Sequence, residues 1–403
     1  MLLSNIPQIR FPGFNQPWKK TKLIDNCERI SVGLATSVTE HYRDTGVPIV
    51  RNQNIKGGYF DGTKMLYLCE DFAEANESKA AKGLDVVTVR TGSNLGQTCV
   101  LPKEFDNCQT FTTLITTPTQ SALNSYFLSI HMNSVFGKKE FARLQVGGGK
   151  DNMNTSHLKS YKIYAPELEE QQKIADFLSS VDKKISLLKE KHTLLTQYKK
   201  GAMQKLFKQE LRFKDEHGND FPDWELKKGN KIFDAISNKN HDSDLPILAI
   251  TQEHGAIPRE LINYQVQVTE GSVAGYKVVD KGDFIISLRS FQGGIEYSNY
   301  KGICSPAYII LRPSIKVNDD FYRYYLKTGN FIQEMKKRLE GIRDGKILSY
   351  KYFSEIKLPN PCVEEQQKIA EFLGALDVKI NAVHEQVELT QTFKKGLLQQ
   401  MFV

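Results

Sequence analysis

The chain has 403 residues, of which 40% are hydrophobic and 25% charged, and its formal net charge is +7 at pH 7. This length exceeds what one hydrophobic core usually holds, so two or more domains are expected. No stretch approaches the roughly 18 apolar residues of a membrane span, and the first residues lack the pattern of a signal peptide, so the sequence predicts a cytoplasmic protein. The positive charge favours a polyanionic partner.

The six cysteines are scattered along the chain. They form no CxxC pair, and no histidine stands at zinc-ligand spacing from them. We therefore expect reduced thiols in the cores, with neither a disulfide framework nor a metal site.

Residues 1–165 are predicted to form a first globular domain of the α+β class. Short β-branched runs such as DVVTVR, which begins at Asp85, are separated by Gly, Asn and Asp turn signals and predict strands. The stretch 121–144 predicts helix. This mixture favours a small antiparallel or mixed sheet with helices beside it.

Residues 166–210 are predicted to form one long helix, because apolar residues recur there in alternating steps of four and three. Pro166 suits the first helical position, acidic residues follow it, and lysines gather at the far end, as the helix dipole favours. A helix from about residue 167 to residue 207 would be roughly 60 Å long at ~1.5 Å per residue. Such a helix needs a partner of similar length.

The remaining residues repeat this plan, with a second α+β domain over 211–360 and a second helix over 361–403. In the second domain DFIISLR, from Asp283, predicts a strand, and the stretch 321–342 predicts helix. The segment EEQQKIADFLSSVDKKI begins at Glu169, and EEQQKIAEFLGALDVKI begins at Glu364, 195 residues later without a gap. Chance does not produce such a match, so this is a true internal repeat. The helices have kept their sequence while the globular segments have diverged.

We predict that the two helices pair antiparallel as a coiled coil, which would give the chain a pseudo-two-fold internal repeat. The alternative is that each helix packs on its own domain. Lys199 and Lys394 interrupt the seam at equivalent positions. They either reach solvent or fix the register, or they mark a place where a partner's helix docks. The residues predicted for the seam and for partner docking are Ile174, Leu178, Val181, Ile185, Leu188, Leu195, Ile369, Leu373, Leu376, Ile380, Val383 and Val387.

No catalytic motif stands in a supporting context. QVGGGKDN lacks the first glycine and the hydroxyl residue of a P-loop. PDWELK, from Pro222, holds its carboxylates too close in sequence to form a nuclease metal site. We therefore predict that the chain is not an enzyme by itself and has no catalytic residue.

The doubled helix, ending in YKKGAMQKLF and FKKGLLQQMF and placed after a variable domain that opens near FP…W, resembles the specificity subunit of type I restriction-modification enzymes. The resemblance covers essentially the whole chain. It implies two target recognition domains, each reading one half of a bipartite, asymmetric DNA site. It also implies that the helices set the spacing of the half-sites and dock two modification subunits.

The same resemblance implies its partners and cofactors. The partners are double-stranded DNA, the modification (methyltransferase) subunits and the restriction (translocase and nuclease) subunits, with no membrane. No cofactor is expected in this chain, because S-adenosylmethionine, ATP and Mg²⁺ act on other subunits of such a complex. Two alternatives remain: the recognition subunit of a type IIB-like restriction system, and a non-catalytic coiled-coil scaffold with two ligand-binding heads.

Contacts to bases need amides and forked donors that reach the edges of the major groove, while lysines hold phosphates. Polar residues that follow probable strands or lie in glycine-rich loops are the candidates. In the first domain they are Arg51, Asn52, Gln53, Asn54, Arg90, Ser93, Asn94, Lys150, Asn152 and Asn154. In the second they are Thr251, Gln252, Arg289, Ser290, Gln292, Arg343 and Lys346.

Overall fold

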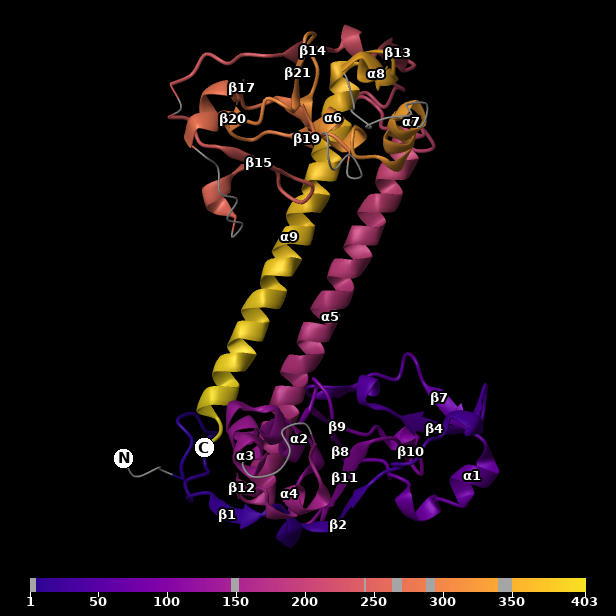
Figure 1. Cartoon of the computed structure of the whole chain (residues 1–403), viewed down its shortest axis with the longest axis vertical. Coiled ribbons are helices and arrows are strands. Elements are labelled where there is room, and N and C mark those ends of the chain that lie inside the picture. Colours follow the sequence, from indigo (N-terminus) through magenta and orange to yellow (C-terminus); the bar gives the residue numbers. More distant parts are fainter. Residues whose placement is uncertain (1–4, 146–151, 243, 263–269, 288–293, 340–349) are drawn as a thin grey trace. The chain divides into compact units, whose positions relative to one another are not determined.

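The computed structural model describes residues 5–145, 152–242, 244–262, 270–287, 294–339 and 350–403. The chain divides into two compact units (Figure 1). Unit 1 comprises Met1–Glu190 with His384–Val403, and unit 2 comprises Lys191–Val383. Each unit thus holds one globular part, the start of the long helix that follows it and the end of the other long helix. No helix in the described ranges is long and apolar enough to span a membrane.

The globular part of unit 1 is built on a four-stranded antiparallel sheet with the order β2-β11-β8-β9. Its strands are β2 (Cys27–Val32), β11 (Thr113–Pro118), β8 (Val86–Val89) and β9 (Thr98–Val100), and helix α2 (Ser125–Asn133) packs across β8 and β9 (Figure 1). All of β8 is buried, because successive side chains point to opposite faces and both faces are covered. Val86 joins a core with Trp18 and Phe127, whereas Val87 joins a second core with Ile115.

Smaller elements of unit 1 surround this sheet. A second sheet has the order β10-β4-β7-β3, in which β10 and β4 are parallel. Its strands are β10 (Gln109–Thr110), β4 (Val47–Val50), β7 (Leu66–Leu68) and β3 (Tyr42–Arg43). β1 (Lys19–Lys22) pairs with β12 (Lys162–Ala165), and β5 (Ile55–Lys56) forms a hairpin with β6 (Tyr59–Phe60). The short helices are α1 (Glu70–Glu74), α3 (Val135–Gln145) and α4 (Thr155–Ser160).

The helical stretch predicted over 121–144 is two helices, α2 and α3, that are separated at Ser134. The Ser134 hydroxyl donates to the carbonyl of His131 at 2.6 Å and accepts from the amide of Gly137 at 3.2 Å. Gly137 packs so closely that an added Cβ would lie 2.3 Å from the His131 carbonyl oxygen. Ser134 therefore ends one helix and starts the next, and the glycine permits the tight contact between them.

The globular part of unit 2 repeats the main sheet of unit 1, with the order β14-β21-β18-β19. Its strands are β14 (Phe233–Ile236), β21 (Ile309–Pro313), β18 (Phe284–Ile286) and β19 (Glu296–Tyr297). β13 (Glu225–Lys228) pairs with β22 (Lys357–Asn360), β15 (Leu248–Thr251) with β16 (Gly255–Pro258), and β17 (Lys277–Val279) with β20 (Gly302–Cys304). The helices are α6 (Asp319–Tyr325), α7 (Gly329–Leu339) and α8 (Tyr350–Ser354). The internal repeat therefore extends from the sequence to the order of the strands.

The helical stretch predicted from residue 321 is also two helices, α6 and α7. The Thr328 hydroxyl accepts from the amide of Phe331 at 3.3 Å and donates to the carbonyl of Tyr325 at 2.8 Å. Because this side chain satisfies backbone groups at the end of α6 and the start of α7, the chain can turn there.

The two long helices are α5 (Leu168–Phe207), of 40 residues, and α9 (Val363–Gln400), of 38 residues. In unit 1 the start of α5 and the end of α9 belong to the same globular core, where Phe402 lies 5.5 Å from Phe127 between ring centres. In unit 2 the end of α5 and the start of α9 share a core in the same way, through Leu206 and Ile369. The helices therefore run antiparallel within each unit, which confirms the predicted α+β fold with two long antiparallel helices.

The prediction that Pro166 occupies the first helical position is wrong, because α5 begins at Leu168. The carbonyl of Glu167 accepts from the amides of Glu170 and Gln171 at 3.0 and 3.1 Å, so Glu167 flanks the first turn of α5 and Pro166 precedes it. The carbonyl of Pro166 is instead bound by the side chain of Gln171 at 2.9 Å. The proline ring sets the approach of the chain to the helix but is not part of it.

Candidate nucleic-acid interface

Three of the predicted DNA-contacting segments of unit 1 meet at one surface. The loop after β4 touches the loop after β8, because the side chain of Asn52 donates to the carbonyl of Thr91 at 3.4 Å. The loop after β8 touches the third segment, because Arg90 Nε donates to Asn152 Oδ1 at 2.9 Å and to the carbonyl of Met153 at 3.0 Å. Segments that are distant in sequence thus form one polar edge of the globular part.

Two of the predicted residues hold the backbone of these loops, the buried Asn54 and the exposed Asn154. Asn54 is only 2% exposed. Its side chain accepts from the amide of Arg51 at 3.0 Å and donates to the carbonyl of Asp61 at 2.9 Å. Asn154 caps the N-terminus of α4 by accepting from the amide of His157 at 3.1 Å. Both asparagines therefore hold backbone in place, as this residue type commonly does at turns and caps.

The other candidates of unit 1 lie at or near the surface. Gln53, Ser93, Asn94 and Asn152 are exposed. Arg51 is half-buried, and its guanidinium donates to the carbonyl of Lys64 at 3.1 Å. Contact of these residues with DNA stays a prediction.

The candidates of unit 2 that the structure describes lie in the turn of the β15–β16 hairpin. Thr251 Oγ1 donates to the carbonyl of Gly255 at 3.1 Å and accepts from the amide of His254 at 3.0 Å. The carbonyl of the exposed Gln252 accepts from Lys327 Nζ at 3.0 Å. Lys327 also contacts the buried Glu296 carboxylate at 2.6 Å. The hairpin turn is therefore tied to the core by an ion pair.

Burial raises the pKa of Glu296, and Lys327 opposes this shift. The remaining candidates, Lys150, Arg289, Ser290, Gln292, Arg343 and Lys346, lie outside the described residues.

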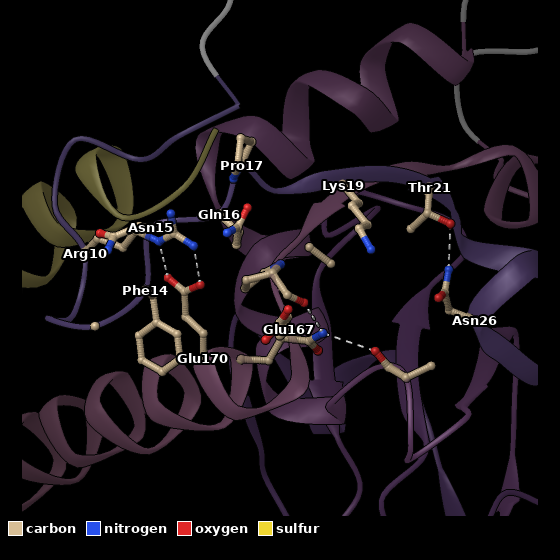
Figure 2. A pocket seen from close by; sticks show the side chains of 15 residues that line it. Arg10, Phe14, Asn15, Gln16, Pro17, Lys19, Thr21, Asn26, Glu167 and Glu170 are labelled. Atoms are coloured by element: carbon tan, nitrogen blue, oxygen red, sulfur yellow. Dashed lines mark hydrogen bonds and ion pairs between the residues drawn. The ribbon is translucent and has the colours of Figure 1, made fainter.

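The second glutamate of each EEQQ segment binds an arginine from far away in the sequence. Figure 2 shows the guanidinium of Arg10 facing the carboxylate of Glu170, with contacts of 2.6 and 2.7 Å, beside a pocket of about 350 Å³. Glu170 is 1% exposed, and the hydrogen bonds that Arg10 donates to its carboxylate raise the pKa of Arg10. In unit 2 Arg212 binds Glu365 in the same way, at 3.1 and 2.9 Å. Paired, charge-assisted hydrogen bonds of this kind fix both position and orientation.

The two glutamines of the repeat complete the same anchor. Gln171 Oε1 accepts from the backbone amide of Asn124 at 2.9 Å, and Gln172 Oε1 accepts from the Asn124 side chain at 2.7 Å. The Asn124 side chain in turn caps α2 by accepting from the amide of Phe127 at 3.0 Å.

Unit 2 repeats these bonds with Gln366, Gln367 and Asn318, at 2.8 and 2.5 Å. The residues of the EEQQ segments thus attach each long helix to the globular part that precedes it.

The predicted seam begins in the globular cores, because its residues from Ile174 to Ile185 and from Ile369 to Leu376 join the cores of the globular parts. Most of its residues are buried, and Leu188, Leu195 and Ile380 are half-buried. The two lysines that interrupt it are paired: Lys394 Nζ contacts Asp182 at 2.5 Å in unit 1, and Lys199 Nζ contacts Asp377 at 2.5 Å in unit 2. These pairs occupy equivalent positions of the repeat, so each unit has one polar layer across its helices.

Residues 15–197 and 224–391 each match the family model of the Type I restriction modification DNA specificity domain. Each match contains one globular part and most of the helix that follows it. The chain belongs to this family of type I restriction-modification specificity proteins.

Relatives of this specificity chain match it over nearly its whole length. The putative type I restriction enzyme MjaX specificity subunit of Methanocaldococcus jannaschii is 25% identical over 406 residues, which cover 95% of this chain and 92% of the relative. The type I restriction-modification S subunit from M. genitalium has the same fold, with a TM-score of 0.59 at 17% identity over 99% of both chains. A chain solved in a study of complex assembly and conformational transition of the type I R-M system gives a TM-score of 0.56 at 18% identity, over 98% of this chain and 99% of that one.

Sequence reasoning missed Arg10 and Arg212, which anchor the helices of the specificity chain. A signal was present, because IRF at Ile9 and LRF at Leu211 each precede a tryptophan, Trp18 or Trp224, at the start of a globular part. In the described residues no group of three or more His, Cys, Asp or Glu could hold a metal ion.

Proposed function

We propose that this specificity chain recognises one bipartite, asymmetric site on double-stranded DNA, with each unit reading one half of it. The observation that supports this most strongly is the double family match, which falls once on each unit. The two globular parts share the order of strands in their main sheets but carry different loops. Two different readers in one chain free the half-sites from the palindromy that a homodimer imposes.

The polar edge of unit 1 has the chemistry that base readout needs. Carboxamides such as those of Asn52 and Gln53 can pair with adenine edges, and a guanidinium such as that of Arg90 can pair with guanine. Arg90 is held by Asn152, so its planar fork is oriented before DNA arrives. In unit 2 the turn that carries Gln252 is the matching element.

We further propose that the helices set the gap between the half-sites and dock two modification subunits. The seam residues are buried or half-buried, so a partner would meet the exposed side chains instead. Two apolar pairs stand out: Leu194 and Tyr198 in unit 2, at 56% and 58% exposed, and Leu389 and Phe393 in unit 1, at 62% and 55%. They occupy the same positions of the repeat, and residues four apart share one helix face. Two equal faces suit two copies of one partner.

Changing one of these faces is expected to remove one modification subunit. Leu194→Asp with Tyr198→Asp should leave one copy bound instead of two, because burying two such side chains contributes about 3–6 kcal/mol, or at least a hundredfold in affinity. Native mass spectrometry of the complex measures the stoichiometry. Gln197→Asp with Gln204→Asp, two exposed residues of the same helix, is the control. Two bound copies in the double variant, at unchanged affinity, would contradict the assignment.

We propose that the chain carries out no chemistry itself. Methylation would then depend on S-adenosylmethionine bound by the modification subunits, and cleavage on ATP and Mg²⁺ bound by restriction subunits. This chain would contribute the choice of sequence and the frame on which the other subunits assemble.

The proposed function is tested by sequencing the methylated bases of a host that lacks its own DNA methylation. The host expresses this chain together with the modification subunit from the same genome. We expect one motif made of two different short half-sites with a fixed gap, and no methylation when this chain is omitted. Methylation that does not depend on the chain, or that follows one continuous palindrome, would refute the proposal.

A further inference from the structure

Unit 1 contains a groove of about 640 Å³ between the β5–β6 hairpin and its helix pair. The turn of the hairpin, at Gly57, Gly58 and Tyr59, forms one wall. The other wall is formed by Asp182, Lys183, Ser186 and Lys189 of α5, together with Gln391 and Lys394 of α9. The groove lies next to the polar edge described above, because the hairpin directly follows the Arg51–Asn54 loop.

The charge of this groove is positive. Three lysines line it against one carboxylate, that of Asp182, and Lys394 contacts this carboxylate at 2.5 Å. The side chains of Lys183 and Lys189 are exposed on the helix surface. An extended anion that entered the groove would therefore meet ammonium groups from the helix side.

The hairpin wall is narrow and fixed. Gly58 has a φ of +105°, which favours glycine, and its amide donates to the carbonyl of Thr98 in the main sheet at 3.0 Å. Tyr59, next to it, is 62% exposed. A ligand can approach the backbone of the turn closely, because Gly57 and Gly58 have no side chains and only the ring of Tyr59 is exposed beside them.

Unit 2 contains an equivalent groove with different residues. Its volume is about 650 Å³, and it lies between the β15–β16 turn and the helix pair of that unit. Gln252, Tyr297, Arg323 and Lys327 line the globular side, and Lys199 and Asn381 line the helix side. The Lys199–Asp377 pair stands where Lys394–Asp182 stands in unit 1. Two hairpins of different sequence thus face the same layer of the repeated helices.

Both units have this groove, although their recognition loops differ. A groove common to both units suits a part of the DNA that is common to both half-sites. The bases differ between half-sites, whereas the sugar–phosphate backbone is the same in both. We infer that each unit holds the DNA phosphate backbone beside its half-site in the groove between hairpin and helix pair, with Lys183 and Lys189 contacting phosphates in unit 1. This inference rests on the proposed function and adds a sequence-independent contact made by lysines of α5 in unit 1.

The test uses the complex of this chain with its modification subunits and a duplex that carries the methylated motif. Lys183→Ala and Lys189→Ala are compared with Lys184→Ala, an exposed lysine of the same helix that does not line the groove. Each groove variant should flatten the slope of log affinity against log salt by about 0.9. Binding should weaken by about eightfold at 0.1 M salt, and the difference should vanish on extrapolation to 1 M. Lys184→Ala should match the wild type.

A second measurement locates the contact on the DNA. Replacing single phosphates beside the half-site of unit 1 with uncharged methylphosphonates should weaken the wild type at one or two positions and leave the corresponding lysine variant unaffected there. Wild-type salt slopes in both variants would overturn the inference while leaving the proposed function intact. A changed methylation motif would also overturn it, because the lysines would then contact bases. Weaker binding of the modification subunits with unchanged DNA binding would assign the groove to a protein partner instead. Failure of the wild type to prefer the motif would count against the proposed function itself.

Discussion

Replacing Arg10 with alanine is expected to lower the free energy of unfolding of unit 1 by about 3–5 kcal/mol. Glu170 is 1% exposed, and among the described residues its carboxylate accepts hydrogen bonds from the Arg10 guanidinium. Removing the arginine leaves a buried charge without its partner, which costs more than the pair contributes. The start of α5 would then lose its main attachment to the globular part.

Urea denaturation followed by tryptophan fluorescence measures this loss. The chain has two tryptophans, Trp18 in the core of unit 1 and Trp224 beside that of unit 2, so a Trp224→Phe background reports on unit 1 alone. Lys173→Ala is the control, since it removes an exposed ion pair with Glu169 and should cost less than about 1 kcal/mol. Replacing both members of the buried pair, Arg10→Met with Glu170→Met, should recover much of the loss. An Arg10→Ala effect no larger than that of the control would contradict this account of the anchor.

The long helices could be predicted from the sequence because their signal is local. Apolar residues that recur every three or four positions define a face of a helix without knowledge of any distant contact. The ungapped repeat then predicts that the two long helices pair, because helices of equal length and pattern can bury each other's apolar faces. The breaks at Ser134 and Thr328 were missed, because a single hydroxyl side chain ends one helix and caps the next within an otherwise helical composition.

The role of the EEQQ letters could not be read from the sequence. The helix dipole alone favours acidic residues in the first turn of a helix. The glutamates of the EEQQ segments therefore gave no reason to look for a partner such as Arg10. The partner of Glu170 lies 160 residues away, and periodicity carries no information on so distant a contact. The glutamate and glutamines of the repeated motif bind each helix to its own globular part, and the roles of the helices as spacer and dock stay predictions.

The sequence only partly distinguishes residues that contact DNA from residues that hold the backbone of loops and helix ends. Asparagine reads adenine in a major groove and also caps helices and closes turns, so the residue type alone does not distinguish these roles. The structure separates them by their partners: Asn54 and Asn154 bind backbone of their own turn or helix start, whereas Asn52 and Asn152 link segments that are distant in sequence at the polar edge.

Exchanging residues 1–165 for those of a relative is expected to change one half of the recognised site completely and leave the other half and the gap unchanged. Unit 1 has its own cores, and its strands pair among themselves. The hybrid must keep three contacts that cross the junction: Arg10 with Glu170, Asn124 with the glutamines of α5, and Trp18 with Phe402 at the end of α9. A relative that carries equivalents of Arg10, Asn124 and Trp18 is therefore the appropriate donor.

The exchange of residues 211–360 is the matched control for this hybrid. It keeps unit 1 intact and should change the opposite half of the site. The gap should be the same in both hybrids, because α5 and α9 are unchanged.

Methylome sequencing of the two hybrids beside the parent chain tests the central claim most directly. If each unit reads one half-site, the first hybrid shares one half of its motif with the parent, and the second hybrid shares the other half. A hybrid in which both halves change, or one that methylates the parental motif, would contradict the division of DNA recognition between the two units.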